Sequence, residues 1–198
     1  MRIRLMAGYT LALRLPLRLI GPKPYELTLA LPEGERVHMP RTPDGYAPNE
    51  YDADQDRAAL MALHKRCGFA FDEVAFERAL ALCIPGGVKI VRHTASGEIV
   101  STMMARHLAS NEFPFGGRID WLATDVAHRG RGLGRLAAAL ATRHLIERGY
   151  KKIWVTTQPH RTDAIRVFTS LGFRPTERTR NKYDWPTLER AVQKGASR

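Results

Sequence analysis

The sequence has 198 residues, of which 44% are hydrophobic and 26% charged, and this composition is typical of a globular domain with an apolar core. No apolar run reaches the roughly 18 residues of a membrane span, and the basic N-terminal stretch shows no cleavage site, so neither a membrane anchor nor a secretory signal is expected. The two cysteines, Cys67 and Cys83, fit buried positions in a reducing, cytoplasmic compartment, and no spacing of Cys and His indicates a metal site.

The positive charge of the chain is concentrated in its C-terminal part. The net charge is +11; residues 1–127 contain 15 basic and 15 acidic residues, whereas residues 128–198 contain 16 basic and 5 acidic ones. This part of the chain is therefore expected to meet an anion. A nucleic acid, a phosphorylated cofactor and an arginine-rich composition without any partner are all compatible with the charge alone.

The first 45 residues are rich in proline and glycine and are predicted to form an N-terminal extension. Alternating leucines over residues 13–19 indicate extended structure. Residues 25–31 and 35–39 have the pattern of a hairpin whose turn contains proline and glycine. A single domain is predicted to follow over residues 46–198.

From residue 46 onward the hydrophobic pattern becomes regular. Apolar residues at three- and four-residue spacing predict helices, and alternation between turn residues predicts strands. Helices are predicted over residues 54–67, 71–83, 133–148 and 162–171, and strands over 88–93, 98–107, 118–124 and 151–157, with an extended segment at 172–185. The order β-α-α-β-β-β-α-β-α-β predicts an α/β (α+β) fold with a mixed central sheet flanked by helices.

The sequence HRGRGLG at residues 128–134 lies between a predicted strand and a predicted helix. A helix N-terminus offers unpaired backbone N–H groups and roughly half a positive charge, so this position can hold a phosphate. Glycines allow the phosphate to approach the backbone. Arg129, Arg131 and Arg135 can add charge-assisted hydrogen bonds.

Three known types of glycine-containing binding segment each differ from residues 128–134. Gly132, Gly134 and Ala137 match the G-x-G-x-x-A pattern of dinucleotide-binding folds, but the next strand ends in Thr-Thr-Gln without the acidic residue that would hold a ribose. The Gly-Lys-Ser/Thr of a Walker loop is absent. An RGRG segment that binds nucleic acid is usually flexible and interleaved with aromatic residues, whereas this one is fixed between two elements.

The segment LATDVAHRGRGLGRLAAAL resembles the acyl-CoA binding motif of the GNAT superfamily of N-acetyltransferases. In that family a strand with a bulge runs into R/Q-x-x-G-x-G/A at the start of a helix, and Arg129, Gly132 and Gly134 match these positions. The segment WVTTQPHRTDAIRVFTSLGF resembles the next strand and helix of the family, which end in a Gly-Phe pair. The resemblance is specific over residues 117–176, depends on element order over 46–116, and does not cover the N-terminal extension.

The resemblance implies that acetyl-CoA is the cosubstrate and that the loop holds its pyrophosphate, which would explain the uneven charge. The implied loop residues are Arg129, Gly130, Arg131, Gly132, Leu133, Gly134 and Arg135. The strand backbone at Leu122, Ala123 and Thr124 would pair with the pantetheine arm and the acetyl carbonyl. An N–H directed at that carbonyl would also stabilise the oxyanion of the tetrahedral intermediate.

The sequence departs from the catalytic pattern of the family in three places. Phe168 replaces the tyrosine that often serves as general acid, four residues after Ala164. Arg161 replaces an asparagine, and it either contacts a coenzyme phosphate or is a solvated residue at a helix start. Thr156 aligns with the glutamate base of some members. Tyr183 is either a substitute phenol or a half-buried aromatic residue of the sheet.

Asp120 is the predicted catalytic base, because an ammonium must lose a proton before its nitrogen can attack a thioester. It lies four residues before Thr124, where some members of the family carry a carboxylate or a histidine. Strand alternation predicts that Asp120, Leu122 and Thr124 share one face. The alternative for Asp120 is a structural ion pair with an arginine such as Arg118.

These features predict an N-acetyltransferase that moves an acetyl group from acetyl-CoA to a primary amine by direct transfer in a ternary complex. The alternative is a basic, non-catalytic module that binds acyl-CoA or nucleic acid. The expected partner is a small-molecule or peptide amine, with no nucleic acid, no membrane and no metal. The sequence does not identify the acceptor, and it leaves a homodimer open.

Overall fold

The computed structural model of the chain describes residues 26–70 and 72–194. Its elements, in chain order, are β1 (Leu27–Leu31), β2 (Tyr46–Glu50), α1 (Ala53–Arg66), α2 (Glu73–Ala81), β3 (Cys83–His93), β4 (Ile99–His107), β5 (Gly117–Thr124), the 3₁₀ helix η3 (Val126–His128), α3 (Leu133–Glu147), β6 (Ile153–Thr157), α4 (Thr162–Ser170), β7 (Arg174–Pro175), α5 (Glu177–Lys182) and α6 (Trp185–Lys194). The predicted order of strands and helices from residue 46 to β7 is confirmed.

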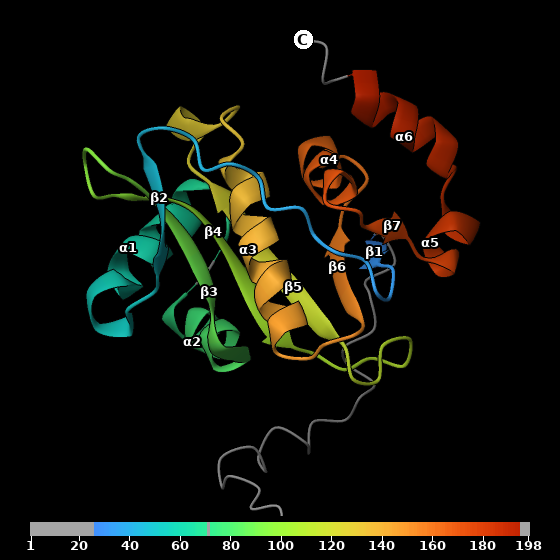
Figure 1. The fold of residues 1–198 in the computed structure, drawn as a ribbon, viewed down its shortest axis with the longest axis horizontal. Coiled ribbons are helices and arrows are strands. Elements are labelled where there is room, and N and C mark those ends of the chain that lie inside the picture. Colours follow the sequence, from blue (N-terminus) through green and yellow to red (C-terminus); the bar gives the residue numbers. More distant parts are fainter. Residues whose placement is uncertain (1–25, 71, 195–198) are drawn as a thin grey trace, which may run out of the picture.

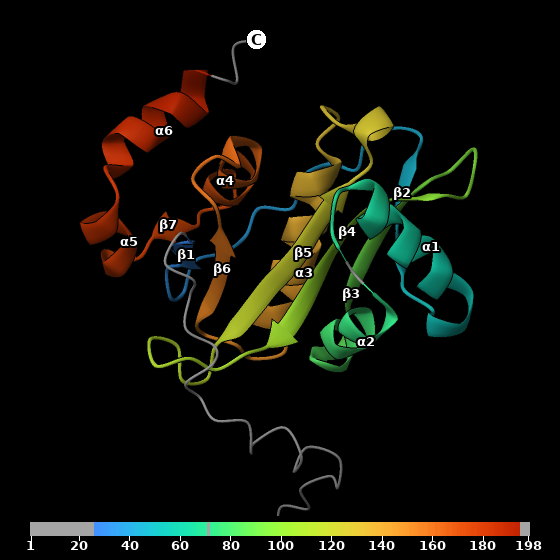
Figure 2. The same ribbon diagram turned by 180° about the vertical axis from the view of Figure 1, so that it is seen from behind.

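Within the described residues, seven strands form one mixed sheet in the order β2-β3-β4-β5-β6-β1-β7. The neighbouring strands are antiparallel except for β5 and β6, which are parallel. Helix α3 covers one face of the sheet (Figure 1), and α1 and α2 cover the other face (Figure 2). The predicted fold class, a mixed sheet flanked by helices, is therefore confirmed.

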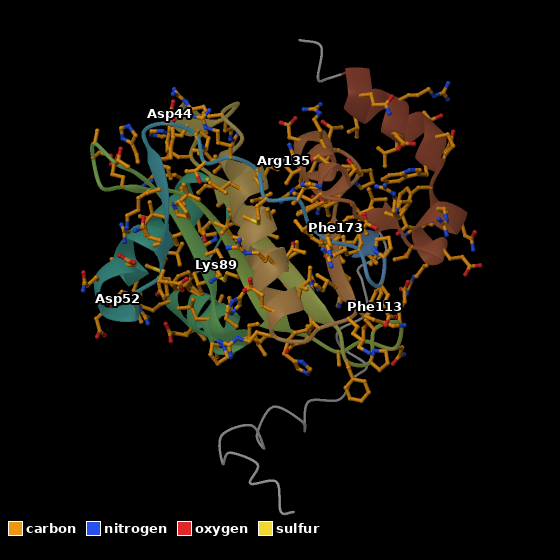
Figure 3. The ribbon with its side chains drawn as sticks, viewed as in Figure 1. Asp44, Asp52, Lys89, Phe113, Arg135 and Phe173 are labelled. Carbon is orange, nitrogen blue, oxygen red and sulfur yellow. The ribbon has the colours of Figure 1, made fainter. Side chains whose placement is uncertain are left out.

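Each face of the sheet has its own apolar core. On the α3 face, alanines of α3 pack with leucines and valines of the strands, and Phe173 completes this core beside α3 (Figure 3). On the other face, Leu60 and Leu63 of α1 and Phe76 of α2 pack on β3 and β4. Each fully buried apolar side chain of this size contributes roughly 1.5–3 kcal/mol. The two cores hold β5, which carries most of the predicted site, between them.

The hairpin predicted in the N-terminal extension is wrong. Its first strand forms as β1, but β1 pairs with β6 and β7 rather than with the residues that follow its turn. Leu27, Leu29 and Leu31 are buried there. Residues 35–39 form no strand. A local pattern cannot distinguish a hairpin partner from a distant one, and burial of three leucines inside the sheet favours the distant one.

The extended segment predicted at 172–185 is also largely wrong. Only Arg174 and Pro175 form a strand, and the helices α5 and α6 follow. Thr176 is the N-cap residue of α5, and its hydroxyl accepts a hydrogen bond from the Thr179 N–H at 3.3 Å. This capping contact, together with the absence of a long apolar alternation, favours helix over strand.

Among the described residues no helix combines the length and the apolar character that crossing a membrane would require. The extended structure predicted for residues 13–19 lies outside the described residues.

Candidate active site

The parallel strands β5 and β6 separate in the middle of the sheet. Their ladder contains two residue pairs, which involve Gly117 and Arg118 of β5. β5 continues to Thr124, and the two strands diverge towards their carboxyl ends (Figure 2). From Ile119 onward the β5 edge is therefore not paired with β6. An extended ligand can make strand-like hydrogen bonds to such an edge.

A bulge interrupts β5 in this unpaired part. Here β5 has one residue more than the facing stretch of β4, and Trp121 has a φ of 63°. Asp120 consequently faces the core under α1 and α2, whereas Leu122 and Thr124 approach Gly134 of α3. The prediction that Asp120, Leu122 and Thr124 share one face is therefore wrong. Simple alternation does not hold across a bulge, because the extra residue shifts the register by one.

The glycine loop connects η3 to α3 through two left-handed residues. Gly130 has a φ of 75° and Gly132 a φ of 80°, and an added Cβ would meet no atom within 4 Å at either position. Glycine is needed here for its backbone conformation rather than for space. Gly132 is the N-cap residue of α3 and has no side chain that could accept a capping hydrogen bond from the helix. The first turn of α3 also contains no acidic residue. The first N–H groups of α3 thus form the arrangement that binds phosphate.

Gly134 has a different role from the two loop glycines. An added Cβ would lie 3.1 Å from the Thr124 hydroxyl and 3.8 Å from the side chain of Leu122. Its missing side chain therefore allows the first turn of α3 to pack directly on the end of β5. The helix N-terminus and the open strand edge become one continuous surface.

Basic side chains surround the loop. Arg129 is exposed and donates its Nε–H to the Thr124 carbonyl at 3.2 Å. Arg131 is exposed, and Arg135 lies on the first turn of α3 and reaches towards the last residue of α4 at 3.5 Å (Figure 3). Leu133 is buried in the core, so that only its backbone N–H can meet a ligand.

The C-terminal turn of α1 is hydrogen-bonded to the segment between β5 and the glycine loop. Arg66 donates to the Asp125 carboxylate at 2.9 Å, and the Ala127 N–H donates to the same carboxylate at 3.1 Å. Burial alone would raise the pKa of Asp125, but these two bonds and the nearby charges of Arg66 and His128 together outweigh it, and the pKa is lowered. The thiol of Cys67 donates to the Thr124 carbonyl at 3.4 Å. The end of β5 is therefore tied to α1 on the side opposite α3.

Asp120 is 7% exposed and lies between two arginines. Arg106 of β4 donates Nη1–H to Oδ2 at 2.8 Å, and Arg118 donates Nε–H to Oδ1 at 2.8 Å. Arg118 also donates to the Thr156 hydroxyl at 2.7 Å, and its guanidinium lies 4.7 Å from the ring centroid of Trp154. Both carboxylate oxygens of Asp120 thus already accept a hydrogen bond from a guanidinium. This agrees with the alternative prediction that Asp120 forms a structural ion pair with Arg118.

The other residues that the sequence analysis compared with the catalytic pattern of the family do not lie together. Phe168 is 2% exposed and packs in the core on the α3 side. Tyr183 follows α5 and packs against Leu27 and its neighbours, away from the Asp120 cluster. Arg161 is the N-cap residue of α4, and its guanidinium lies 5.9 Å from the ring centroid of Phe69 in the α1–α2 connection. Asp120 thus lies on β5, and the glycine loop follows the end of that strand, whereas Tyr183 lies near neither of them.

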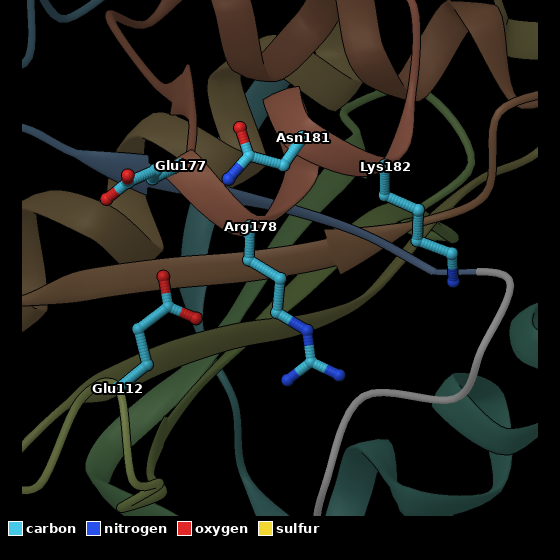
Figure 4. A pocket seen from close by; sticks show the side chains of 5 residues that line it. All are labelled: Glu112, Glu177, Arg178, Asn181 and Lys182. Atoms are coloured by element: carbon cyan, nitrogen blue, oxygen red, sulfur yellow. The ribbon is translucent and has the colours of Figure 1, made fainter.

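Two pockets lie outside the predicted site. One, of about 700 Å³, lies between the β4–β5 loop and α5 (Figure 4) and is lined by Glu112, Glu177, Arg178, Asn181 and Lys182. The other, of about 400 Å³, is lined by residues of α1, α2 and β3. Within the described ranges, His, Cys, Asp and Glu form no group of three that could hold a metal ion.

Two residues beside the site were not predicted from the sequence. Arg106 is a basic residue at an inward-facing position of a buried strand, and that position is the sequence feature that could have identified it. His64 is fully buried, with Nε2 3.2 Å from the Trp121 carbonyl and Nδ1 3.0 Å from the Leu60 carbonyl. Its helical spacing from Leu60 and Leu63 is that of the apolar face of α1, but no local pattern indicates its partner on β5.

Comparison with known proteins places the chain among the acetyltransferases. The sequence profile of the acetyltransferase (GNAT) family matches residues 57–173. A mycothiol acetyltransferase of Nocardia farcinica is 29% identical over 141 residues, which are 67% of this chain and 46% of that protein. One of Catenulispora acidiphila is 33% identical over 72 residues, 36% of this chain and 23% of that protein. The chain spans less than half the length of these two relatives.

Solved structures share the fold at low sequence identity. A GCN5-related N-acetyltransferase from Sphaerobacter thermophilus has a TM-score of 0.62 and 20% identity, and the match covers 76% of this chain and 48% of the other. One from Kribbella flavida has a TM-score of 0.55 and 24% identity, covering 75% and 53%. The profile match spans more than half of the 198 residues and includes β5, the glycine loop and α3. The chain therefore belongs to the GNAT family of acetyltransferases.

Proposed function

We propose that this chain is an N-acetyltransferase that moves the acetyl group of acetyl-CoA directly to a primary amine in a ternary complex. Family membership supports acetyl transfer with acetyl-CoA as the cosubstrate. The observation that carries the proposal is the continuity of the unpaired β5 edge with the uncapped N-terminus of α3. An extended acyl-pantetheine arm fits the edge, and the pyrophosphate to which it is joined fits the helix end.

The cosubstrate contacts follow from this placement. The backbone of Leu122, Ala123 and Thr124 pairs with the pantetheine arm and the acetyl carbonyl. The N–H groups of residues 130–134 hold the pyrophosphate, and the exposed guanidiniums of Arg129, Arg131 and Arg135 add charge. Arg161, at the start of α4 with its guanidinium 5.9 Å from the Phe69 ring, is the further residue that we assign to a coenzyme phosphate.

The chemistry is one nucleophilic substitution at the thioester. The amine nitrogen forms a bond to the carbonyl carbon, and the electron pair of the C=O moves to oxygen, where the Leu122 N–H stabilises it. Collapse of this intermediate breaks the C–S bond, and the thiolate leaves while the amine gives up a proton to a base. A thiol pKa of about 8.5 makes the thiolate a tolerable leaving group, so the absence of a hydroxyl at Phe168 is compatible with transfer.

The two cysteines support direct transfer over an acyl-cysteine intermediate. Burial raises the pKa of Cys67, and burial raises the pKa of Cys83 to about 12. A thiolate is the nucleophilic form of cysteine, and both side chains remain largely protonated near neutral pH. The chain contains no other cysteine.

Asp120 is the candidate base, acting directly or through water. Tyr183 is the acid predicted from the sequence, but its packing beside Leu27, away from Asp120, does not support that role. Asp120 is the carboxylate closest in sequence to the bulge on β5, which favours it. Its two arginines bear on this role, because each guanidinium bond occupies one acceptor site of the carboxylate and a proton must use one of the sites that remain. Asp120 therefore has two competing roles, base and anchor for the arginines.

Thermal unfolding with CoA and with acetyl-CoA tests the cosubstrate site. At a ligand concentration a hundredfold above Kd, binding should stabilise the fold by about 2.7 kcal/mol and raise Tm by several degrees. Gly132→Glu should abolish the shift, since a carboxylate would occupy the phosphate position. Gly149→Glu is the matched control: Gly149 follows the other end of α3, has a φ of 84°, and has equal space around an added Cβ.

Each outcome has a clear meaning. A shift that Gly132→Glu abolishes and Gly149→Glu retains supports the cosubstrate site and justifies a screen of acceptors. The screen contains a lysine peptide, a peptide N-terminus, a diamine, an aminoglycoside and deacetylated mycothiol, since two relatives are named for mycothiol. No shift of the native chain at millimolar cosubstrate would refute the proposal, and steeply salt-dependent retention on DNA or RNA would then favour a nucleic-acid module.

A further inference from the structure

His64 connects helix α1 to the bulge of β5. The side chain is fully buried, and its two ring nitrogens contact two backbone carbonyls, that of Leu60 one turn earlier in α1 and that of Trp121 on β5. Phe69 packs edge-on against both His64 and Trp121, with ring centroids 5.4 and 5.8 Å away. The end of α1 and the connection that follows it thus hold the bulge through a hydrogen bond and through aromatic packing.

The residue held in this way has an unusual backbone conformation. Trp121 has a φ of 63°, and it is the one non-glycine residue with positive φ in the described chain. Such a conformation costs on the order of 1–3 kcal/mol for a residue with a bulky side chain, and it persists only where the surroundings enforce it. A bulge also interrupts the ladder of hydrogen bonds between strands. Contacts from outside the sheet, such as those of His64 and Phe69, therefore maintain this conformation.

The bond to Trp121 requires that His64 be the donor. A carbonyl oxygen only accepts, so each of the two contacts is a hydrogen bond only when the ring nitrogen carries a proton. Burial lowers the pKa of His64, although both carbonyl contacts raise it in part, and the lowered pKa favours the neutral ring, which carries one N–H. In an α-helix the carbonyl of residue 60 is the regular acceptor of the backbone N–H of residue 64. With its proton on Nε2, His64 donates a hydrogen bond to the Trp121 carbonyl of β5, and the Leu60 carbonyl keeps its backbone donor in the helix.

One rigid peptide unit joins the Trp121 carbonyl to the N–H of Leu122. The described chain has no cis peptide, so this carbonyl and this N–H point in opposite directions. A donor that fixes the oxygen therefore fixes the direction of the N–H as well. It also polarises the peptide, and this strengthens the hydrogen bond that the N–H donates.

We propose that His64 is a positioning residue that donates its Nε2–H to the Trp121 carbonyl and thereby directs the Leu122 N–H at the thioester carbonyl. This inference rests on the proposed function, which assigns that N–H to the acetyl group. His64 itself touches neither substrate. Its effect should appear in the polarisation of the thioester and should leave the phosphate contacts at α3 unchanged.

The test compares two amide replacements of His64 in the full chain. In His64→Gln the amide nitrogen can take the position of Nε2, whereas in His64→Asn it reaches only the position of Nδ1, beside the Leu60 carbonyl. Each protein is saturated with acetyl-CoA that carries ¹³C in the thioester carbonyl, and the stretching band of the bound carbonyl is measured by infrared difference spectroscopy. Calorimetric titration with CoA, which has no acetyl group, reports the phosphate site separately.

The native chain and His64→Gln should give the same low-frequency band, and His64→Asn should give a band at higher frequency. The Kd for CoA should agree within threefold among the three proteins. The same band in His64→Asn as in the native chain would overturn the inference while leaving the proposed function intact. A native chain that binds no CoA would instead refute the proposed function. His144→Gln on α3, which replaces another histidine bonded to a carbonyl, should leave both readouts at the native value.

A measurement on the native chain covers the case in which His64→Asn does not fold. The ¹⁵N chemical shifts of labelled histidine distinguish a ring nitrogen that carries a proton from one that does not. The proposal requires the proton of His64 to reside on Nε2 at pH 7. A proton on Nδ1 with a bare Nε2 would overturn it, because a bare nitrogen cannot donate to the Trp121 carbonyl.

Discussion

At Asp120 a single buried carboxylate accepts hydrogen bonds from two guanidinium groups, that of the buried Arg106 and that of the half-buried Arg118. Arg106 and Asp120 are each more than nine-tenths buried, and Arg118 retains an exposed fraction of 18% in its side chain. The Nε of Arg106 has no hydrogen-bond partner in the described structure. A buried charge without its partner is costly, so the carboxylate holds the strands β4 and β5 together whatever it does in the reaction.

Asp120→Asn should therefore lower stability as well as activity. The substitution leaves two guanidiniums facing a neutral amide, and we expect the free energy of unfolding in urea to fall by about 3–5 kcal/mol. The double variant Asp120→Asn/Arg106→Gln removes one of the stranded charges and should recover at least about 1 kcal/mol of this loss.

Activity in the double variant separates the two roles of Asp120. Release of CoA with an accepted amine should remain abolished in the stabilised double variant if Asp120 is the base. Recovery of turnover together with stability would show that Asp120 acts only by holding its arginines.

At the scale of elements, the contact between α3 and β5 depends on small side chains. The alanines at 137, 138, 139 and 141 are fully buried against the sheet, and Gly134 continues this close approach to the first turn. The Thr124 hydroxyl that faces Gly134 is held by a 2.9 Å hydrogen bond to Ser101. It has little freedom to move away from a larger residue.

Gly134→Val should separate the first turn of α3 from β5. We expect a loss of about 1–3 kcal/mol in the free energy of unfolding, as for other overpacked contacts, together with weaker CoA binding because the helix end moves relative to the strand edge. Thr124→Ala removes the hydroxyl that the new side chain meets. The double variant should be more stable than the sum of the single effects predicts, by at least about 0.5 kcal/mol, and strict additivity would contradict this explanation.

At the scale of the whole molecule, β1 is an interior strand of the sheet and joins β6 to β7. It lies between β6 and β7, the last strands of the chain, although it is the first element that the structure describes. Leu29 packs in the main core opposite Val155. The part of the chain predicted as an extension therefore contributes a strand to the sheet that carries the site.

Leu29→Ala tests this contribution. Removal of a fully buried leucine should lower the free energy of unfolding by about 2–5 kcal/mol, measured in urea. Glu33→Ala, an exposed change two residues beyond the strand, should stay within about 0.5 kcal/mol of the native chain. A loss below 1 kcal/mol for Leu29→Ala would mean that β1 is not an integral strand.

The sequence by itself determined the features that depend on neighbouring residues. The order of the elements from residue 46 to β7 follows from hydrophobic period and turn residues, and the structure confirms it. The glycine loop could be predicted as a phosphate site because such a site at a helix N-terminus needs a fixed local spacing, and the structure has the two left-handed glycines at the start of α3. The ion pair of Asp120 with Arg118 was foreseen as an alternative, since the two residues are neighbours on one strand.

Only the tertiary structure decided the features that depend on distant residues. The partners of β1, the pairing of Asp120 with Arg106 and the bond from His64 to Trp121 each join segments that no local pattern relates. The bulge reversed the predicted faces of β5, because the extra residue is visible only against its neighbour β4. Local propensity selects helix or strand, whereas register and pairing are chosen by the burial of whole faces, and that burial exists only once the sheet has assembled.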